Sequence, residues 1–321
     1  MLLPHRMNQR RELALGCMAM SGMYGPASET ESIATIHEAI DRGITLLDTG
    51  DFYGSGHNEM LIGRAIRDRR DRVRLSVKFG AMRAPGGMFI GFDSRPAAVK
   101  NSLAYSLVRL GVEHIDIYRP SRLDPNVAIE ETIGAIKEMI DAGHVRQIGL
   151  SEVGVEIIRR AQAVHPIHDL QIEYSIVSRG PETKIFPALE QLGIKVTAYG
   201  LLSRGLLSGS RPTGPADFRR HLPRFSGENL ERNQRVVEVL RDLAEERNVT
   251  PSQLAIAWVL AKNENVIPVI GPRTREQLRD ALGALDVTLS ADDVKRIESA
   301  VPEVAGTRYD ERQMKNLDSE K

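Results

Sequence analysis

Three residues whose types cooperate in proton transfer lie close together in the first quarter of the chain. Asp48 follows the apolar pair Leu46 and Leu47, Tyr53 lies five residues later in a glycine-rich turn, and Lys78 interrupts an apolar run. A lysine in such a run is costly to desolvate unless it is paired, and Asp48 is the natural partner. The ammonium would favour the phenolate, so we expect a lowered pKa for Tyr53 and a role as general acid. The alternative is a structural salt bridge beside a surface tyrosine.

Polar side chains also end or interrupt three later apolar runs. Ser151 and Glu152 end the run VRQIGLSE, Gln171 interrupts DLQIEYS, and Tyr199 lies in KVTAYG. Hydroxyl and amide groups suit an uncharged amide ligand, and an aromatic ring can stack on a flat one. For Gln171 and Tyr199, a hydrogen-bonded core position is the alternative.

A basic turn follows the last apolar run, NVIPVIGP. Gly271 opens the turn, Arg273 and Arg275 follow, and a helix begins near Thr274. A helix amino terminus flanked by arginines favours an anion. Two arginines suggest a phosphate with two charges, such as a ribose 2′-phosphate. A solvated helix start is the alternative.

The elements that must position these residues alternate along the chain between strand-like apolar runs and helical patterns. About eight strand–helix units predict an α/β fold, a (β/α)8 TIM barrel, as a single domain over 1–321. A doubly wound sheet is less favoured, because SGMYGPAS after the first run lacks the spacing of a dinucleotide-binding turn. In a barrel the catalytic residues lie at the carboxyl ends of the strands, which is where the candidates fall.

Three segments exceed the basic barrel. Residues 229–263 hold two helical patterns after the seventh strand, and 290–303 predict a carboxyl-terminal helix capped by Ser290 with Asp293 three residues on. Residues 203–228 are rich in Gly, Pro, Ser and Arg, which predicts a long loop of the kind that is usually functional or mobile.

Composition restricts the function further. The 43 basic and 43 acidic residues balance, so nothing favours a nucleic acid or an anionic membrane as partner. The single cysteine excludes an internal disulfide framework, and there is neither an apolar leader nor a run of membrane-spanning length. We expect a cytoplasmic protein and predict no metal site, and the oligomeric state stays open.

Several of these stretches, in order and over nearly the whole chain, resemble the aldo-keto reductase family. They are GCMAMSGMYGPA, ITLLDTGDFYGSGHNEMLIGRAI, RVRLSVKFG, IEETIGAIKEMIDAGHVRQIGLSE, QIEYS, SRGLLSG, IPVIGPRTREQL and the closing AGTRYDERQM. The resemblance implies an NADPH-dependent reductase of small-molecule carbonyl compounds. In that family hydride passes from the nicotinamide to the carbonyl carbon, and a tyrosine protonates the oxygen.

The resemblance also implies a role for each candidate residue. The catalytic set would be Asp48, Tyr53 and Lys78. The cofactor contacts would be Ser151 and Gln171 at the carboxamide, Glu152 where the family has Asn or Glu, Tyr199 on the nicotinamide, Arg204 and Gly205 over the pyrophosphate, and Gly271, Arg273 and Gln277 at the 2′-phosphate and adenine. Asp280 stands near an acidic adenine contact, although Ala281 replaces the usual Asn there.

The pattern departs from the family at the end of the fourth strand. The fourth catalytic residue is normally a His followed by Arg, any residue and Asp, and Arg122 and Asp124 align this position with Ser121. A serine donates one hydrogen bond but carries no positive charge near neutral pH. The segment has a short similarity to pyridoxal reductases. Arg119 and Arg122 could also favour an anionic substrate such as a phosphate ester, although the resemblance favours a structural role for Arg122, because family members with neutral substrates have it too.

Three interpretations therefore stay open. The leading one is carbonyl reduction, with pyridoxal as a candidate substrate. The second is a weakly catalytic, NADPH-binding subunit that regulates a channel. The third is an enzyme that works mainly as an alcohol dehydrogenase. Substrate choice would depend on residues 21–28, 81–95, 203–228 and the tail after 303.

Overall fold

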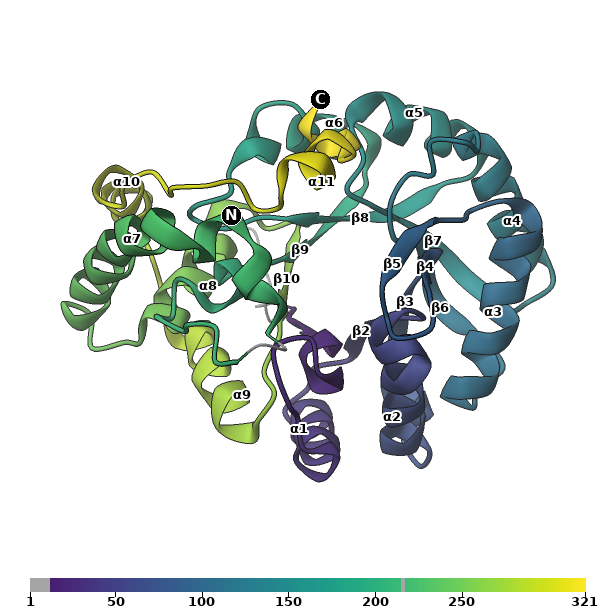
Figure 1. The fold of residues 1–321 in the computed structure, drawn as a ribbon, viewed down its shortest axis with the longest axis horizontal. Helices are drawn as coiled ribbons and strands as arrows, with labels where there is room; N and C mark the ends of the chain where they lie inside the picture. Colours follow the sequence, from purple (N-terminus) through teal and green to yellow (C-terminus); the bar gives the residue numbers. More distant parts are fainter. Residues whose placement is uncertain (1–11, 215–216) are drawn as a thin grey trace, which may run out of the picture.

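The computed structural model describes residues 12–214 and 217–321. The predicted domain over 1–321 and the loop 203–228 therefore include positions, 1–11 and 215–216, that lie outside the described residues. Eight parallel strands close into a barrel in the order β1-β10-β9-β8-β7-β6-β3-β2 (Figure 1). They are β1 (Ala14–Gly16), β2 (Leu46–Gly50), β3 (Arg74–Phe79), β6 (Ile115–Pro120), β7 (Val145–Ser151), β8 (Ile167–Glu173), β9 (Lys195–Tyr199) and β10 (Val266–Ile270). The predicted barrel is confirmed.

Helices surround the strands. They are α1 (Glu29–Asp41), α2 (His57–Ile66), α3 (Pro96–Leu110), α4 (Ile129–Asp141), α5 (Val155–Val164), α6 (Ile185–Leu192), α7 (Gly227–Glu245), α8 (Pro251–Lys262), α9 (Arg275–Leu282), α10 (Ala291–Ala300) and α11 (Glu311–Lys315). The two helices expected after the seventh barrel strand are α7 and α8. The predicted cap of α10 is also confirmed, because Ser290 and Asp293 form a reciprocal capping box.

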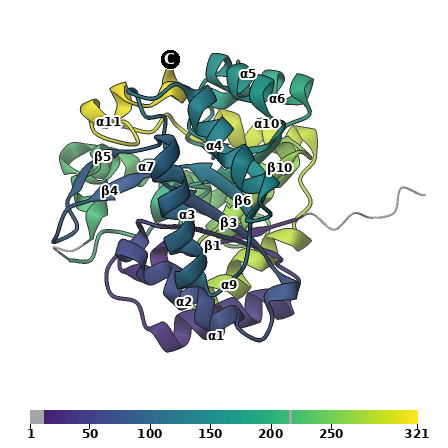
Figure 2. The ribbon, with the colours of Figure 1, turned by 90° about the vertical axis from the view of Figure 1, so that its right-hand side faces the viewer.

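Two connections at the strand ends carry structure of their own. In its described residues, the segment predicted as a loop contains three 3₁₀ turns, at Ser203–Gly205, Phe218–His221 and Pro223–Phe225. A hairpin of β4 (Ala81–Arg83) and β5 (Phe89–Phe92) follows β3, where only a loop is expected from the sequence. The hairpin and α11 lie on the same side of the molecule, at the left of Figure 2.

The alternation of side chains along each strand separates two cores. One set fills the barrel interior and includes Ala14, Leu46, Ile117, Ile267 and Val269. The other, much larger set packs the outer face of the strands against the helices. Because residues two apart on a strand share a face, Asp48 and Arg119 point into the interior with Leu46 and Ile117. No helix in the described ranges is long and apolar enough to cross a membrane.

Candidate active site

A buried network of polar side chains joins the ends of β2, β3 and β8. The Lys78 ammonium donates to Asp48 at 2.5 Å and to the Gln171 amide oxygen at 2.9 Å. The Gln171 amide nitrogen and the Ser76 hydroxyl donate to the other Asp48 oxygen at 2.7 and 2.8 Å. Burial lowers the pKa of Lys78, and the charge of Asp48 opposes that shift. The predicted Asp48–Lys78 pair is therefore present, and Gln171 belongs to the same network.

Tyr53 lies directly after β2, in a turn that Gly54 and Gly56 allow with positive φ angles. Its ring centroid is 5.3 Å from Lys78 Nζ, and the side chain is 7% exposed. The expected lowering of its pKa is wrong for this structure. Burial, and then the charge of Asp48, raises the pKa of Tyr53 well above 10, while Lys78 directs its hydrogen bonds to Asp48 and Gln171. The phenol is therefore fully protonated at neutral pH.

Ser121 lies at the end of β6, beside the end of β3. Its backbone N–H donates to the Phe79 carbonyl at 2.8 Å. Its side chain is 3% exposed, and the hydroxyl has no hydrogen-bond partner within the described chain. A buried hydroxyl without a partner costs free energy unless a bound molecule or water satisfies it. The position that departs from the family pattern thus offers one unused hydrogen-bonding group.

Arg122 links Ser121 to the carboxyl-terminal tail. Its guanidinium donates to the Ser121 carbonyl at 2.6 Å, to the Ser151 hydroxyl at 3.3 Å and to the Tyr309 hydroxyl at 3.1 Å. Burial raises the pKa of Tyr309, but the charges of Arg204 and Arg122 outweigh burial and lower it. Tyr309 is therefore a phenol held between arginines, at the ends of β6, β7 and β9.

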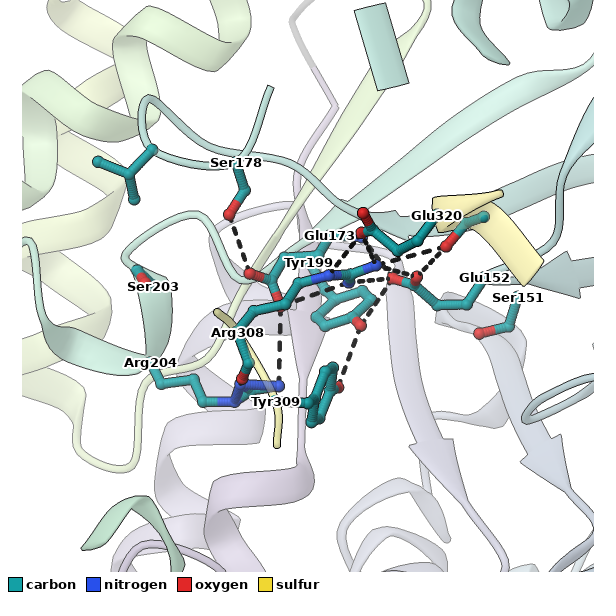
Figure 3. Close-up of polar contacts among 12 residues, drawn as sticks. Ser151, Glu152, Glu173, Ser178, Tyr199, Ser203, Arg204, Arg308, Tyr309 and Glu320 are labelled. Carbon is teal, nitrogen blue, oxygen red and sulfur yellow. Dashed lines mark hydrogen bonds and ion pairs between the residues drawn. The ribbon is translucent and has the colours of Figure 1, made fainter. Parts of the chain in front are cut away.

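Glu152 lies at the centre of a second buried network, shown in Figure 3. The two terminal nitrogens of the Arg308 guanidinium donate to its carboxylate, at 2.8 and 2.6 Å, and the Tyr199 and Ser319 hydroxyls donate to it at 2.8 and 2.7 Å. Burial raises the pKa of Glu152, but the hydrogen bonds and charge of Arg308 overcome burial and hold it at about 2. The side chain of Glu152 is thus ionised and fixed by the tail.

Strained backbone conformations concentrate around these networks. In the described chain, four of the five non-glycine residues with positive φ flank the strand ends: Ser55, Glu152, Ser203 and Arg204. Arg204 and Gly205 belong to the turn after β9, and the Arg204 guanidinium lies 4.5 Å from the centroid of the Tyr309 ring. Such conformations cost free energy and are typical of functional sites.

The predicted anion site lies at the end of β10. Gly271 follows the strand, the Arg273 guanidinium donates to the Tyr24 carbonyl at 3.1 Å, and Gln277 accepts a hydrogen bond from the Arg273 N–H at 2.8 Å. Thr274 caps α9. Arg275 pairs with Glu31 through two nitrogens, at 3.1 and 3.0 Å, in an ion pair that is partly exposed, and the phosphate site with two arginines stays a prediction. The Asp280 carboxylate accepts a hydrogen bond from Thr250 at 2.8 Å.

Comparison with known proteins identifies the family of the chain. The model of the aldo/keto reductase family matches residues 12–302. The chain belongs to the aldo/keto reductase family. Probable aldo-keto reductase 1 from Glycine max is 40% identical over 307 residues, which cover 93% of this chain and 88% of that protein.

Solved structures of this reductase fold superpose over most of the chain. The glycerol dehydrogenase AKR11B4 from Gluconobacter oxydans gives a TM-score of 0.81 at 30% identity, covering 90% of each chain. An aldo/keto reductase from Klebsiella pneumoniae, solved in complex with NADP and acetate, gives 0.71 at 24% identity, covering 93% of this chain and 94% of that chain. The second likeness concerns the fold. By its family, the protein is an oxidoreductase.

In this aldo/keto reductase, Arg119 lies inside the barrel and not at the barrel mouth, where it would have to lie to contact a substrate. Arg119 is 0% exposed and lies inside the barrel, where its guanidinium contacts Asp169 at 3.0 Å, the Ser76 hydroxyl at 3.0 Å and the Leu150 carbonyl at 3.3 Å. Thr197 also donates to Asp169. The suggestion that Arg119 favours an anionic substrate is therefore wrong, because Asp169 already neutralises its charge within the barrel.

Three residues at the mouth of the reductase barrel have no role predicted from the sequence: Glu173, Arg224 and Arg308. Glu173, at the end of β8, lies 3.4 Å from Arg224, 3.7 Å from Arg204 and 3.6 Å from Arg308. Arg224 and Arg308 come from the segment after β9 and from the tail, so the contacts join distant parts of the sequence. The polar residue after Gln171 in QIEYS was a signal for Glu173, whereas no local pattern identifies its partners.

Proposed function

We propose that this aldo/keto reductase reduces an aldehyde or ketone to an alcohol with NADPH, and that Tyr53 donates the proton. The observation that carries the proposal is the buried Asp48–Lys78 pair beneath the Tyr53 ring, beside the partnerless hydroxyl of Ser121. NADPH, when bound, supplies hydride to the carbonyl carbon. The protein supplies the proton and the hydrogen bonds that orient the carbonyl oxygen.

The high pKa of Tyr53 suits a proton donor. The phenol keeps its proton at neutral pH and releases it to a strong base, which the oxygen of a carbonyl becomes when its carbon accepts hydride. The charge of Arg122 opposes the rise in the pKa of Tyr53 and so favours the phenolate left after proton transfer, while Lys78, held by Asp48, lies 5.3 Å from the centre of the ring. Ser121 would donate a second hydrogen bond to the same oxygen.

The residues at the barrel mouth fit an NADPH molecule along its length. We assign Tyr199 to stacking on the nicotinamide, with Ser151, Glu152 and Gln171 at its carboxamide end. Gln171 already uses one donor and one acceptor on Asp48 and Lys78, which leaves one of each for a ligand. Arg204 and Gly205 would cover the pyrophosphate.

The adenosine end fits the turn after β10. Gly271, Arg273 and Gln277 would hold the 2′-phosphate and adenine, with Asp280 further along α9. The donor set suits a phosphate, since the Arg273 guanidinium makes its hydrogen bond to a neutral carbonyl rather than to a carboxylate. The capped amino terminus of α9 adds a favourable dipole. With Arg275 paired to Glu31, a single arginine would carry the preference for NADPH over NADH.

Replacing Tyr53 tests the proposal. Tyr53→Phe should lower kcat for the reduction of aromatic aldehydes by at least about 100-fold and leave the NADPH dissociation constant, measured by fluorescence titration, within about threefold. Tyr118→Phe is the matched control, because Tyr118 is buried on the outer face of β6 and donates to the Val99 carbonyl. Carbonyl reduction that survives Tyr53→Phe at full rate would refute the assignment.

Substitutions of Ser121 distinguish an active reductase from a weakly catalytic, NADPH-binding protein. If Ser121 orients the carbonyl, Ser121→Ala lowers kcat/KM with little change in NADPH affinity. Ser121→His restores the residue that the family usually has there and should alter the rate for simple aldehydes. A weakly catalytic, NADPH-binding regulatory protein would instead show negligible turnover on a broad panel, pyridoxal included, with and without these substitutions.

A further inference from the structure

The tail places one positive charge against a buried carboxylate at the mouth of the barrel. Arg308 is 6% exposed and contacts Glu152 through both terminal nitrogens of its guanidinium. This is the only ion pair of Glu152 in the described ranges. Glu173, by contrast, lies within 4 Å of three arginines. The charge of Glu152 therefore depends on Arg308 far more than the charge of Glu173 does.

Glu152 is connected directly to the aromatic ring assigned to the nicotinamide. The Tyr199 hydroxyl donates to the Glu152 carboxylate at 2.8 Å, and Tyr309 approaches the same hydroxyl at 3.4 Å (Figure 3). A flat ring stacked on Tyr199 would therefore have the Glu152–Arg308 pair at its edge. The backbone of Glu152 has a φ of 54°, a conformation that a non-glycine side chain adopts at a cost, so its carboxylate is held there by the surrounding contacts.

The charge at that edge matters because the two redox states of the cofactor differ in charge. The oxidised nicotinamide ring is positive and the reduced ring is neutral. An unpaired buried carboxylate attracts the oxidised form selectively, whereas a carboxylate paired with a guanidinium attracts the two forms nearly equally. A pure change of shape or order at the site would instead alter both affinities together.

We propose that Arg308 sets the relative affinity of the site for NADPH and NADP⁺ by neutralising Glu152 beside Tyr199. The inference rests on the proposed function, because it needs the nicotinamide to lie on Tyr199. Arg308 acts through Glu152 and is a positioning residue. By keeping NADP⁺ from binding too tightly, it favours release of the oxidised cofactor and the reductive direction of the reaction.

The test compares dissociation constants of NADPH, NADP⁺ and 2′-phospho-ADP-ribose for the full chain at pH 8, by calorimetry and fluorescence. In Arg308→Gln, the affinity for NADP⁺ relative to that for NADPH should rise by roughly tenfold or more. This is the effect expected when a unit charge loses its partner in a site of low effective dielectric. Binding of 2′-phospho-ADP-ribose, which lacks the nicotinamide, should change by less than about threefold. Burial raises the pKa of the Glu152 carboxyl once Arg308 is removed, so pH 8 is chosen over neutral pH to favour the ionised carboxylate on which the effect depends.

Three further variants separate charge from structure. Arg308→Lys keeps the charge and should keep the ratio of the two constants near that of the wild type. Glu152→Gln should shift the ratio in the direction opposite to Arg308→Gln. The double variant, Glu152→Gln with Arg308→Gln, should return the ratio to within about threefold of the wild-type value. Glu320→Gln removes a carboxylate that also contacts Arg308 but is 41% exposed, and should leave the ratio unchanged.

An equal loss of affinity for both nucleotides in Arg308→Gln would overturn the proposal, as would an unchanged ratio. The folded state of each variant is checked by circular dichroism. If Arg308→Gln does not fold, the ratio in Glu152→Gln and in the double variant decides. Failure of the proposed function shows separately, as turnover that survives Tyr53→Phe or as equal changes for all three ligands in Tyr199→Ala.

Discussion

Asp51, two residues before Tyr53, carries a carboxyl group whose ionisation opposes folding. Its N–H donates to the Lys78 carbonyl at 2.9 Å, while its Oδ1 is buried with no partner in the described chain. Burial, and then the charge of nearby Glu59, raises the pKa of Asp51 from 3.8 to about 7. We predict that Asp51→Asn, which has the shape of the protonated acid without its charge, stabilises the protein above neutral pH.

The magnitude follows from linkage. Between about pH 4 and pH 7 the folded protein keeps a proton that the unfolded chain has released, so its contribution to stability is lost as pH rises through that window. Three pKa units at about 1.4 kcal/mol each give roughly 4 kcal/mol as the largest loss. Partial solvent access of Asp51 makes the loss of unfolding free energy smaller than this maximum. Between pH 5 and pH 8 the expected loss is about 2 kcal/mol.

Urea unfolding followed by circular dichroism at pH 5, 6, 7 and 8 measures the effect. The difference in free energy of unfolding between Asp51→Asn and the wild type should grow by about 2 kcal/mol across this range. Asp41→Asn is the control for the substitution itself, because its carboxylate is largely exposed beside Arg72. A difference for Asp51→Asn that stays constant from pH 5 to pH 8 would refute the reasoning.

Three other substitutions have defined outcomes. Lys78→Met leaves the buried charge of Asp48 without its ion pair and should lower the free energy of unfolding by about 3–5 kcal/mol, most of which Asp48→Asn in the same chain should recover, as measured by urea unfolding. Arg119→Met should destabilise the fold by a similar amount, about 3–5 kcal/mol, by leaving Asp169 unpaired, while KM for neutral and anionic aldehydes changes equally. Arg273→Met should weaken NADPH binding by about tenfold or more and NADH binding hardly at all in fluorescence titrations.

The sequence allowed the barrel and most of the candidate positions to be predicted because parallel strands of a barrel all end at one face. Each polar residue at the end of an apolar run was therefore expected near the others, and Asp48, Lys78 and Gln171 do meet. Arg119 was misjudged although the same alternation applies to it. It follows Ile117 by two positions, so its side chain points into the barrel interior rather than out of the strand end.

The contacts that could not be predicted join residues far apart in the sequence. Arg275 pairs with Glu31, 244 positions away, and Arg308 pairs with Glu152, 156 positions away. Arginine side chains near a helix start look alike whether they contact a ligand or a carboxylate on another helix. The β4–β5 hairpin is different, because Gly86 and Gly87 before the apolar FIGF gave a local turn signal that was available in the sequence.

The surroundings of Ser121 bear on why this chain has a serine where the family usually has a histidine. The nearby polar groups of Asp48, Lys78 and Gln171 are joined in one network, yet the Ser121 hydroxyl is buried without a partner. An unsatisfied hydroxyl costs about 1–3 kcal/mol, and the positive φ angles at Glu152 and Arg204 add further cost at the same barrel mouth. Under the proposed function, the oxygen of a carbonyl substrate would complete the hydrogen bond of Ser121 and offset this cost when the substrate binds.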